Sequence, residues 1–144
     1  MHDIALSHRF TITALIAAPE PLVDRGDRLD FIPITGGTVS GDLTGEVVPG
    51  GGDWCCTRSD GVVAVEARYL VRTASGALVD VHNTGVLRPS DVGDDGAAPY
   101  FLTTPRFRTV DPALHWLTAA VFVGEAHVEG DRVVIEVAEL VVQG

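Results

Sequence analysis

Hydrophobic and polar residues alternate along most of this chain, in short runs separated by Gly, Pro and Asp. Such alternation is typical of β-strands that bury one face, and the periodicity of a helix is almost absent. The pattern predicts nine strands: His8–Ala17, Arg28–Ile34, Gly37–Val48, Asp53–Thr57, Val62–Thr73, Ala77–Leu87, Tyr100–Val110, Ala119–Glu129 and Arg132–Val142.

The connections complete an all-β pattern. Asp111 followed by Pro112 is typical of a helix start, so residues 111–117 are expected to form a turn or a short helical turn. The segment Arg88–Pro99 is rich in Pro, Gly and Asp and is expected to be a loop. The strands fit a sandwich or a barrel, and their length favours a single closed antiparallel β-barrel, because closure removes aggregation-prone edges. No linker or repeat divides residues 1–144.

Two hairpins can be placed in register from their side chains. If residues 74–76 form a three-residue loop, Tyr69 lies opposite Val81 in the hairpin of Val62–Thr73 and Ala77–Leu87. One face of that hairpin is then apolar, and the other carries Glu66, Arg68, Asp80 and His82, with Arg68 opposite His82.

In the C-terminal hairpin, a turn at residues 130–131 sets Ala126 opposite Ile135 and again gives one core face. Which face of the first hairpin points inward stays open at this stage.

Glycines punctuate the first half of the chain. Gly37, Gly41 and Gly45 recur through one predicted strand, which suits bending at barrel corners or bulges. Three consecutive glycines at 50–52 precede Asp53 and Trp54, and such a run indicates a sharp turn or a crowded wall. We therefore expect that carboxylate and that indole to lie together at a rim.

Composition and charge exclude several classes of protein. The chain has 144 residues and a net charge of −10, which disfavours binding to nucleic acids and to anionic membranes. No apolar run approaches the length of a membrane-spanning helix and no signal pattern begins the chain, so a cytoplasmic protein is expected. The only cysteines, Cys55 and Cys56, are adjacent, and neighbours on a strand point to opposite faces, so reduced thiols are expected.

An ordered series of motifs carries a family resemblance. It comprises Gly36-Gly37 with Gly41, Pro49–Trp54, Asp60-Gly61, Tyr69, Asn83 with Gly85, Tyr100-Phe101-x-Thr103-x-Pro105-x-Phe107, Trp116-Leu117 and Phe122-Val123-Gly124. With these motifs the chain resembles the DUF3237 family, also called UPF0311, over roughly Leu6 to Val142. The resemblance implies a small β-barrel similar to those of allene oxide cyclase and dirigent proteins, enclosing a pocket. Related barrels run cyclisations or isomerisations without a redox cofactor.

The chain departs from the family pattern at two positions. Leu102 stands where the family usually has Arg, and His82 stands where a basic residue is common. Both changes favour a neutral or less charged ligand over a carboxylate, and His82 adds a group that titrates near neutrality.

Three residues are candidate catalytic groups: Asp53, His82 and Tyr69. An Asp in an apolar barrel mouth has a raised pKa that suits proton transfer, although an Asp after glycines also caps turns. A His beside Asp80 or Glu66 is a potential base, although such clusters usually lie on a solvated face.

Further residues are candidates for substrate binding: Trp54, Glu66, Arg68, Asn83, Tyr100, Arg106, Phe107 and Trp116. Core packing explains the aromatic ones equally well, and a surface ion pair explains Arg106. Tyr69 and Asn83 lie on the face opposite His82, so these candidates cannot all line one interior unless a bulge intervenes. We expect Asp53, Trp54 and Trp116 to line one cavity.

No metal or cofactor is predicted, because the histidines are scattered and no Cys-x-x-Cys, phosphate-binding or dinucleotide motif occurs. Three functions stay open: an enzyme without a cofactor that rearranges a small, largely apolar molecule as a cyclase, isomerase or lyase; a lipocalin-like carrier; and a barrel filled by its own side chains. Apolar segments at 119–123 and 137–142 predict a homo-oligomer, expected to be a dimer.

Overall fold

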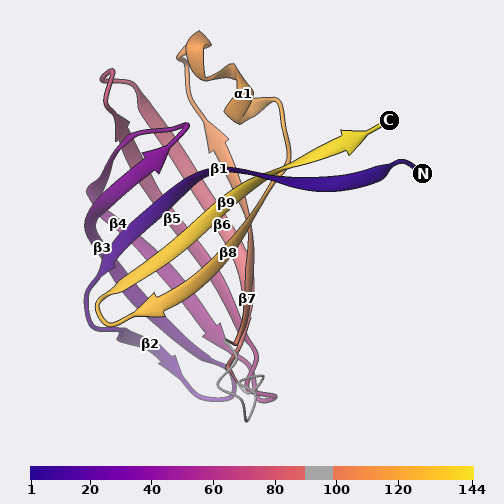
Figure 1. Cartoon of the computed structure of the whole chain (residues 1–144). Coiled ribbons are helices and arrows are strands. Elements are labelled where there is room, and N and C mark those ends of the chain that lie inside the picture. Colours follow the sequence, from indigo (N-terminus) through magenta and orange to yellow (C-terminus); the bar gives the residue numbers. More distant parts are fainter. Residues whose placement is uncertain (90–98) are drawn as a thin grey trace.

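The computed structural model describes residues 1–89 and 99–144, and strands make up most of it (Figure 1). The predicted loop at Arg88–Pro99 lies mostly outside the described residues. Within the described ranges, no helix is long and apolar enough to cross a membrane. The elements are β1 (Asp3–Ile16), β2 (Glu20–Asp24), β3 (Arg28–Gly41), β4 (Gly45–Thr57), β5 (Val63–Thr73), β6 (Leu78–Arg88), β7 (Tyr100–Arg108), η2 (Pro112–Leu114), α1 (His115–Thr118), β8 (Phe122–Glu129) and β9 (Arg132–Gln143).

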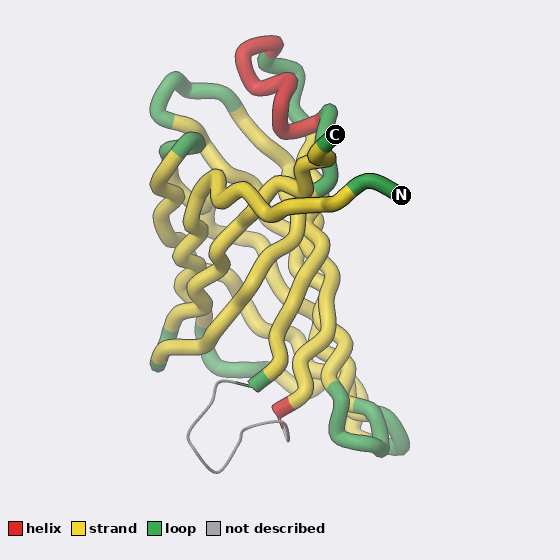
Figure 2. Tube along the Cα trace, turned by 45° about the vertical axis from the view of Figure 1, so that its right-hand side comes forward, coloured by secondary structure: helices red, strands yellow, loops and turns green. Residues whose placement is uncertain are grey.

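The strands form a closed antiparallel barrel (Figure 2). From β2 to β9 each strand pairs with the next along the chain, and β9 pairs with β1. The pairing of β1 with β3 closes the barrel, and β2 is attached outside the ring to β3. The predicted fold class is confirmed. Barrels of about eight strands have interiors just wide enough to be filled by side chains.

Both predicted hairpin registers are confirmed. The backbone N–H of Thr73 donates to the carbonyl of Ala77 at 2.8 Å, which closes the three-residue loop. Tyr69 then lies opposite Val81 and Arg68 opposite His82, while Ala126 lies opposite Ile135. The apolar face turns inward, and the polar face of β5 and β6 is therefore the outer wall.

The strand predicted at Gly37–Val48 is wrong. β3 ends at Gly41, and the chain turns before β4 begins at Gly45. These glycines allow neighbouring backbones to approach closely, because a Cβ at Gly37 would overlap the carbonyl oxygen of Thr13. Strand β2 was not predicted, since all its residues are exposed and alternation of burial is absent.

The glycine run at 50–52 lies within β4 and not at a turn before it. The pairing of β4 shifts here against both neighbours, between Ile34 and Thr38 on β3 and between Val48 and Gly52 on its β5 side. Gly50 has φ +114°, a conformation that favours glycine. The run is thus a bulge in the barrel wall, after which the strand continues through Asp53 to Thr57.

An aromatic cluster fills the end of the barrel beside α1. The ring of Phe10 lies 5.7 Å from Phe107, 6.5 Å from Phe122 and 6.0 Å from Trp116, measured between centroids. The predicted helical turn is confirmed, with the Asp111 side chain accepting a hydrogen bond from the Ala113 N–H at 2.9 Å. This turn places Trp116 and the buried Leu117 against the cluster.

The wall has one short seam. β7 pairs with β8 at only two positions, Leu102 with Glu125 and Thr103 with Gly124. Beyond Thr103, β7 continues to Arg108 while the chain passes through η2 and α1 before β8 begins. The seam leaves an opening in the wall between β7 and this connection.

Candidate functional site

A small cavity of about 30 Å³ lies inside the barrel. Most of its lining is apolar: Ala14, Ile16, Ile34, Val65, Ala67, Phe101, Ala126, Val133 and Ile135. Four polar residues complete this interior cavity: Asp53, Tyr69, Asn83 and Thr103. The cavity thus combines an apolar surface with a few converging polar groups, as small-molecule sites do.

Four consecutive strands supply the polar groups. Asp53 follows the bulge of β4, and Tyr69, Asn83 and Thr103 stand at inward-facing positions of β5, β6 and β7. Because side chains alternate along each strand, the same alternation that builds the core also aims these groups inward.

Three of these polar atoms lack hydrogen-bond partners. The hydroxyl of Tyr69, the amide oxygen of Asn83 and the hydroxyl of Thr103 are buried, and none has a partner within the described part of the chain. An unpaired buried polar group costs about 1–3 kcal/mol of stability. Such groups point to a guest, either water or the polar end of a ligand, that completes their hydrogen bonds.

Asp53 is the titratable group of the cavity. Burial raises the pKa of its carboxyl, and the charge of Glu66 adds to the rise, while hydrogen bonds from the Cys55 thiol and the Glu66 backbone oppose it. Its Oδ1 accepts from the Glu66 N–H at 3.1 Å, so Asp53 is anchored to β5 and does not cap the glycine run.

The neighbours of Asp53 stay protonated. Burial, and then the charge of Asp53, raise the pKa of the Cys55 thiol to about 12. Burial and the same charge raise the pKa of the Tyr69 phenol. Tyr69 is therefore a hydrogen-bond donor at neutral pH. Cys55 and Cys56 are both free, as expected.

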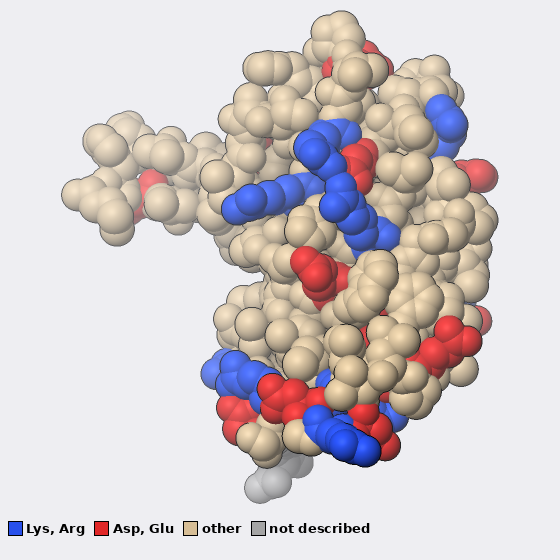
Figure 3. Space-filling view, turned by 180° about the vertical axis from the view of Figure 1, so that it is seen from behind, with Lys and Arg blue, Asp and Glu red and all other residues tan. Residues whose placement is uncertain are grey.

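A second hollow lies on the outside of the same strands, at the seam between β7 and β8. This outer cleft has a volume of about 680 Å³. It is lined by Arg68, Asp80, His82, Thr104, Pro105, Arg106, Phe107, Arg108, Leu117, Thr118, Ala120, Val121 and Phe122. Figure 3 shows basic and acidic side chains gathered on the back of the molecule.

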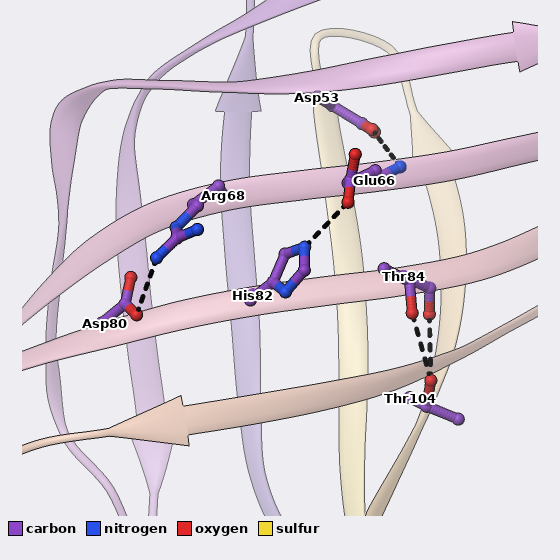
Figure 4. Close-up of polar contacts among 7 residues, drawn as sticks. All are labelled: Asp53, Glu66, Arg68, Asp80, His82, Thr84 and Thr104. Carbon is purple, nitrogen blue, oxygen red and sulfur yellow. Dashed lines mark hydrogen bonds and ion pairs between the residues drawn. The ribbon is translucent and has the colours of Figure 1, made fainter.

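Ion pairs order the outer cleft (Figure 4). Asp80 accepts from Arg108 Nε at 2.8 Å and from Arg68 at 3.3 Å, and these two arginines hold its pKa below the usual range against the opposing effect of burial. His82 Nε2 lies 3.0 Å from Glu66 Oε2. Glu66 therefore contacts both sites, since its backbone N–H binds Asp53 and its carboxylate binds His82.

The structure divides the predicted site residues between two places. Asp53, Tyr69 and Asn83 line the interior cavity. His82, Arg68, Arg106 and Phe107 line the outer cleft, and Glu66 lies beside it through its contact with His82.

The expectation that Asp53, Trp54 and Trp116 line one cavity is wrong. Trp54 points outward, is 40% exposed and lies 5.1 Å from the ring of Phe31. Trp116 belongs to the aromatic cluster beside α1. Tyr100 is also exposed, with the Arg88 guanidinium 3.9 Å from its ring centroid. Adjacent residues on a strand point to opposite faces, so Asp53 and Trp54 cannot share an interior.

Among the lining residues not proposed for the site are Thr103 in the cavity and Arg108 in the outer cleft, and Asp80 was expected only as a partner of His82. Thr103 is an even number of positions from Phe101 and Phe107 in the sequence. Such spacing along a strand places all three side chains on the same, inner face. Nothing local distinguishes Arg108 from other exposed arginines.

Known proteins match this chain in both sequence and fold. The model of a family described as "protein of unknown function (DUF3237)" matches residues 4–140. The chain belongs to the DUF3237 family. A UPF0311 protein of Bradyrhizobium diazoefficiens is 38% identical over 141 residues, which cover 91% of this chain and 93% of that protein.

Solved structures share the fold of this chain. A conserved protein of unknown function from Rhodopseudomonas palustris has a TM-score of 0.88 at 35% identity. The match covers 98% of this chain and 100% of that chain. An enzyme from Penicillium herquei has a TM-score of 0.76 at 17% identity, covering 97% of this chain and 95% of that one. At that identity the likeness concerns the fold alone.

Proposed function

We propose that this protein is an enzyme that rearranges a small, largely apolar organic molecule by acid–base catalysis inside the barrel, with Asp53 as the proton-transfer group. One observation carries the proposal: a partly buried carboxyl with a raised pKa converges with three unpaired buried polar groups in an apolar cavity. Perturbed carboxyls in such surroundings are typical of catalytic acids and bases.

Each polar residue of the cavity has a separate role in this proposal. The Tyr69 hydroxyl donates to an oxygen of the substrate, and Asn83 and Thr103 fix the position of that oxygen. Asp53 removes a proton from one atom and returns it to another, as in an isomerisation, a cyclisation by addition or an elimination. Proton transfer in either direction leaves the oxidation state of the substrate unchanged overall.

The size of the interior cavity limits what enters it. A volume of about 30 Å³ accommodates one polar functional group rather than a whole substrate. The partly exposed side chains of Ile16 and Val133 border the cavity and provide an apolar surface for the rest of the molecule. This arrangement favours a substrate with one oxygen-bearing end and a hydrocarbon body.

The test measures proton exchange without requiring the natural substrate. The protein is incubated in deuterated water with a panel of small apolar ketones, enones and phenols, and deuterium uptake and isomer formation are followed by mass spectrometry. Asp53→Asn keeps the shape but removes the titrating group, so an observed rate is expected to fall by about 10²–10⁴-fold. Asp24→Asn, at an exposed position of β2, is the matched control. An unchanged rate in Asp53→Asn contradicts the assignment.

A non-catalytic, lipocalin-like binding barrel is the second candidate, because the unpaired groups of the cavity need a guest whether or not a reaction follows. Binding of panel compounds that is equal in the wild type and in Asp53→Asn, with no exchange in either, favours the carrier. Absence of binding to both favours a barrel filled by its own side chains.

We also propose that the protein forms a dimer. The ends of β1 and β9 leave the barrel as a two-stranded ribbon, and Ile4, Leu6 and Val142 on it are more than half exposed, at 56%, 67% and 66% (Figure 1). Exposed apolar side chains grouped in this way usually mark an interface. Light scattering is expected to give twice the 15.2 kDa chain mass, and Leu6→Asp to give the monomer. A wild-type monomer at micromolar concentration contradicts the proposal.

A further inference from the structure

We propose that the outer cleft is a second binding site, which takes a small organic anion with a flat apolar body, such as an aromatic carboxylate or sulfonate. The site is separate from the interior cavity, and the inference does not depend on catalysis there. It rests on the shape of the seam, on the charges along one side of it and on the apolar residues along the other.

The shape follows from the short pairing of β7 with β8. The two strands pair only at Leu102 and Thr103. Residues 104–108 of β7 therefore border the cleft instead of a neighbouring strand. Across from it lie Leu117 to Val121 of the connection and Phe122 at the start of β8. A hollow of about 680 Å³ falls within the range of small-molecule sites.

The charged side consists of a row of basic groups across three strands. Arg68 on β5, His82 on β6 and Arg106 on β7 are cross-strand partners, so their side chains stand side by side on the outer wall. Like charges opposed in this way repel one another. Asp80 neutralises part of the row by binding Arg68 and Arg108, and Glu66 binds His82.

Arg106 takes no part in these ion pairs. It has no carboxylate partner among residues 1–89 and 99–144, although the chain carries twenty acidic residues against ten basic ones. In so acidic a protein, three guanidinium groups around one hollow give that hollow a local excess of positive charge. A guanidinium binds carboxylate, sulfonate or phosphate oxygens through two parallel hydrogen bonds, so an anion would satisfy Arg106.

The opposite side selects the body of the ligand. Phe107, Leu117 and Phe122 form an apolar floor, and Val121 is exposed at its edge, with 65% of its surface accessible. Phe107, Leu117 and Phe122 are already almost buried, so Val121 supplies much of the apolar surface that a ligand would cover, and covering it favours a hydrocarbon or aromatic body over a bare inorganic anion.

The experiment uses two fluorescent probes that share an aromatic body. Anilinonaphthalene sulfonate carries the anion, and the neutral N-phenylnaphthylamine does not. The wild type is expected to bind the sulfonate more tightly than the neutral probe. Arg106→Gln is expected to weaken sulfonate binding about tenfold and to leave the neutral probe unchanged. Arg132→Gln removes the same charge from an exposed position in the C-terminal hairpin and is the matched control.

A second variant tests the floor and keeps the arginines. Val121→Glu places a carboxylate at the edge of the cleft without touching the core, and is expected to weaken sulfonate binding at least as much as Arg106→Gln. The proposal is overturned if the wild type does not bind the sulfonate, if both cleft variants bind it like the wild type, or if Arg132→Gln loses as much affinity. Asp53→Asn is expected to retain sulfonate binding, which separates this outcome from the fate of the proposed catalysis.

Discussion

The two sides of strands β5, β6 and β7 carry polar groups of similar type in opposite circumstances. On the inner side, Asp53 is partly buried with no cationic partner among the described residues, and the pKa of its carboxyl is raised. On the outer side, Asp80 has two arginine partners and the pKa of its carboxyl is lowered. The same functional group thus becomes a candidate proton carrier on one face and a fixed anion on the other.

The difference shows that the surroundings of an Asp, and not its residue type, decide whether its pKa is raised or lowered. Inside, the Asp53 carboxyl loses part of its solvation and no cation among the described residues compensates, so its ionisation is costly. Outside, solvent and guanidinium groups stabilise the ionised form. Of the two candidate bases predicted from the sequence, Asp53 has the surroundings of a catalytic group, whereas His82 has those of a member of a surface cluster.

The largest contrast is expected in the pH dependence of stability. The folded-state pKa of Asp53 lies above its ordinary value of 3.8, so ionised Asp53 destabilises the fold; the penalty develops as pH rises from about 3.8 through the raised pKa. The Asp80 pKa lies below 3.8, so its stabilisation is complete above that pH and is lost as pH falls through the lowered pKa. A difference of one pH unit between the folded-state and unfolded-state pKa corresponds to about 1.4 kcal/mol in the free energy of unfolding.

Urea unfolding of Asp53→Asn and Asp80→Asn between about pH 3 and pH 7 measures this contrast. Relative to the wild type, Asp53→Asn is expected to gain stability as pH rises and Asp80→Asn to lose it. Parallel curves for the two variants would show that the inner and outer carboxyls do not differ in the way described.

A smaller effect is expected from the unpaired groups of the cavity. Tyr69→Phe removes a buried hydroxyl that has no partner among the described residues and is expected to stabilise the protein by about 1 kcal/mol. Tyr100→Phe removes the hydroxyl of an exposed residue and serves as the control, with an expected change within about 0.5 kcal/mol. Thermal unfolding measures both, and a marked loss of stability in Tyr69→Phe would mean that its hydroxyl is already satisfied.

The smallest effect is expected at His82. Its bond to Glu66 joins two partly exposed side chains, and exposed ion pairs contribute about 0–1 kcal/mol. His82→Gln is therefore expected to change stability by less than about 1 kcal/mol and any exchange rate by less than about tenfold. Measured beside Asp53→Asn in the deuterium assay, a larger loss in His82→Gln would move the acid–base role to the outer cleft.

Alternation was sufficient to predict much of this molecule. It predicted most of the strands, both hairpin registers and the grouping of Glu66, Arg68, Asp80 and His82 on one face. It was insufficient at Gly50–Gly52, because a bulge and a turn both use glycine at positive φ and differ only in whether the neighbouring strands continue. The strand β2 was missed for a related reason, since an exposed edge strand has no buried face to produce a pattern.

The sequence by itself determined relative orientation, because a strand repeats every two residues. Tyr69 had to point away from His82, and Asp53 and Trp54 had to point to opposite faces, a constraint that the expected shared cavity of Asp53 and Trp54 overlooked. Only the tertiary structure decided which of those faces became the interior, and that Asp53, Tyr69, Asn83 and Thr103 converge on one cavity. It also decided that β7 parts from β8 after Thr103 and opens the outer cleft. The side-chain period is local to each strand, whereas these outcomes depend on how β1 closes on β3 and on the register between strands around the ring.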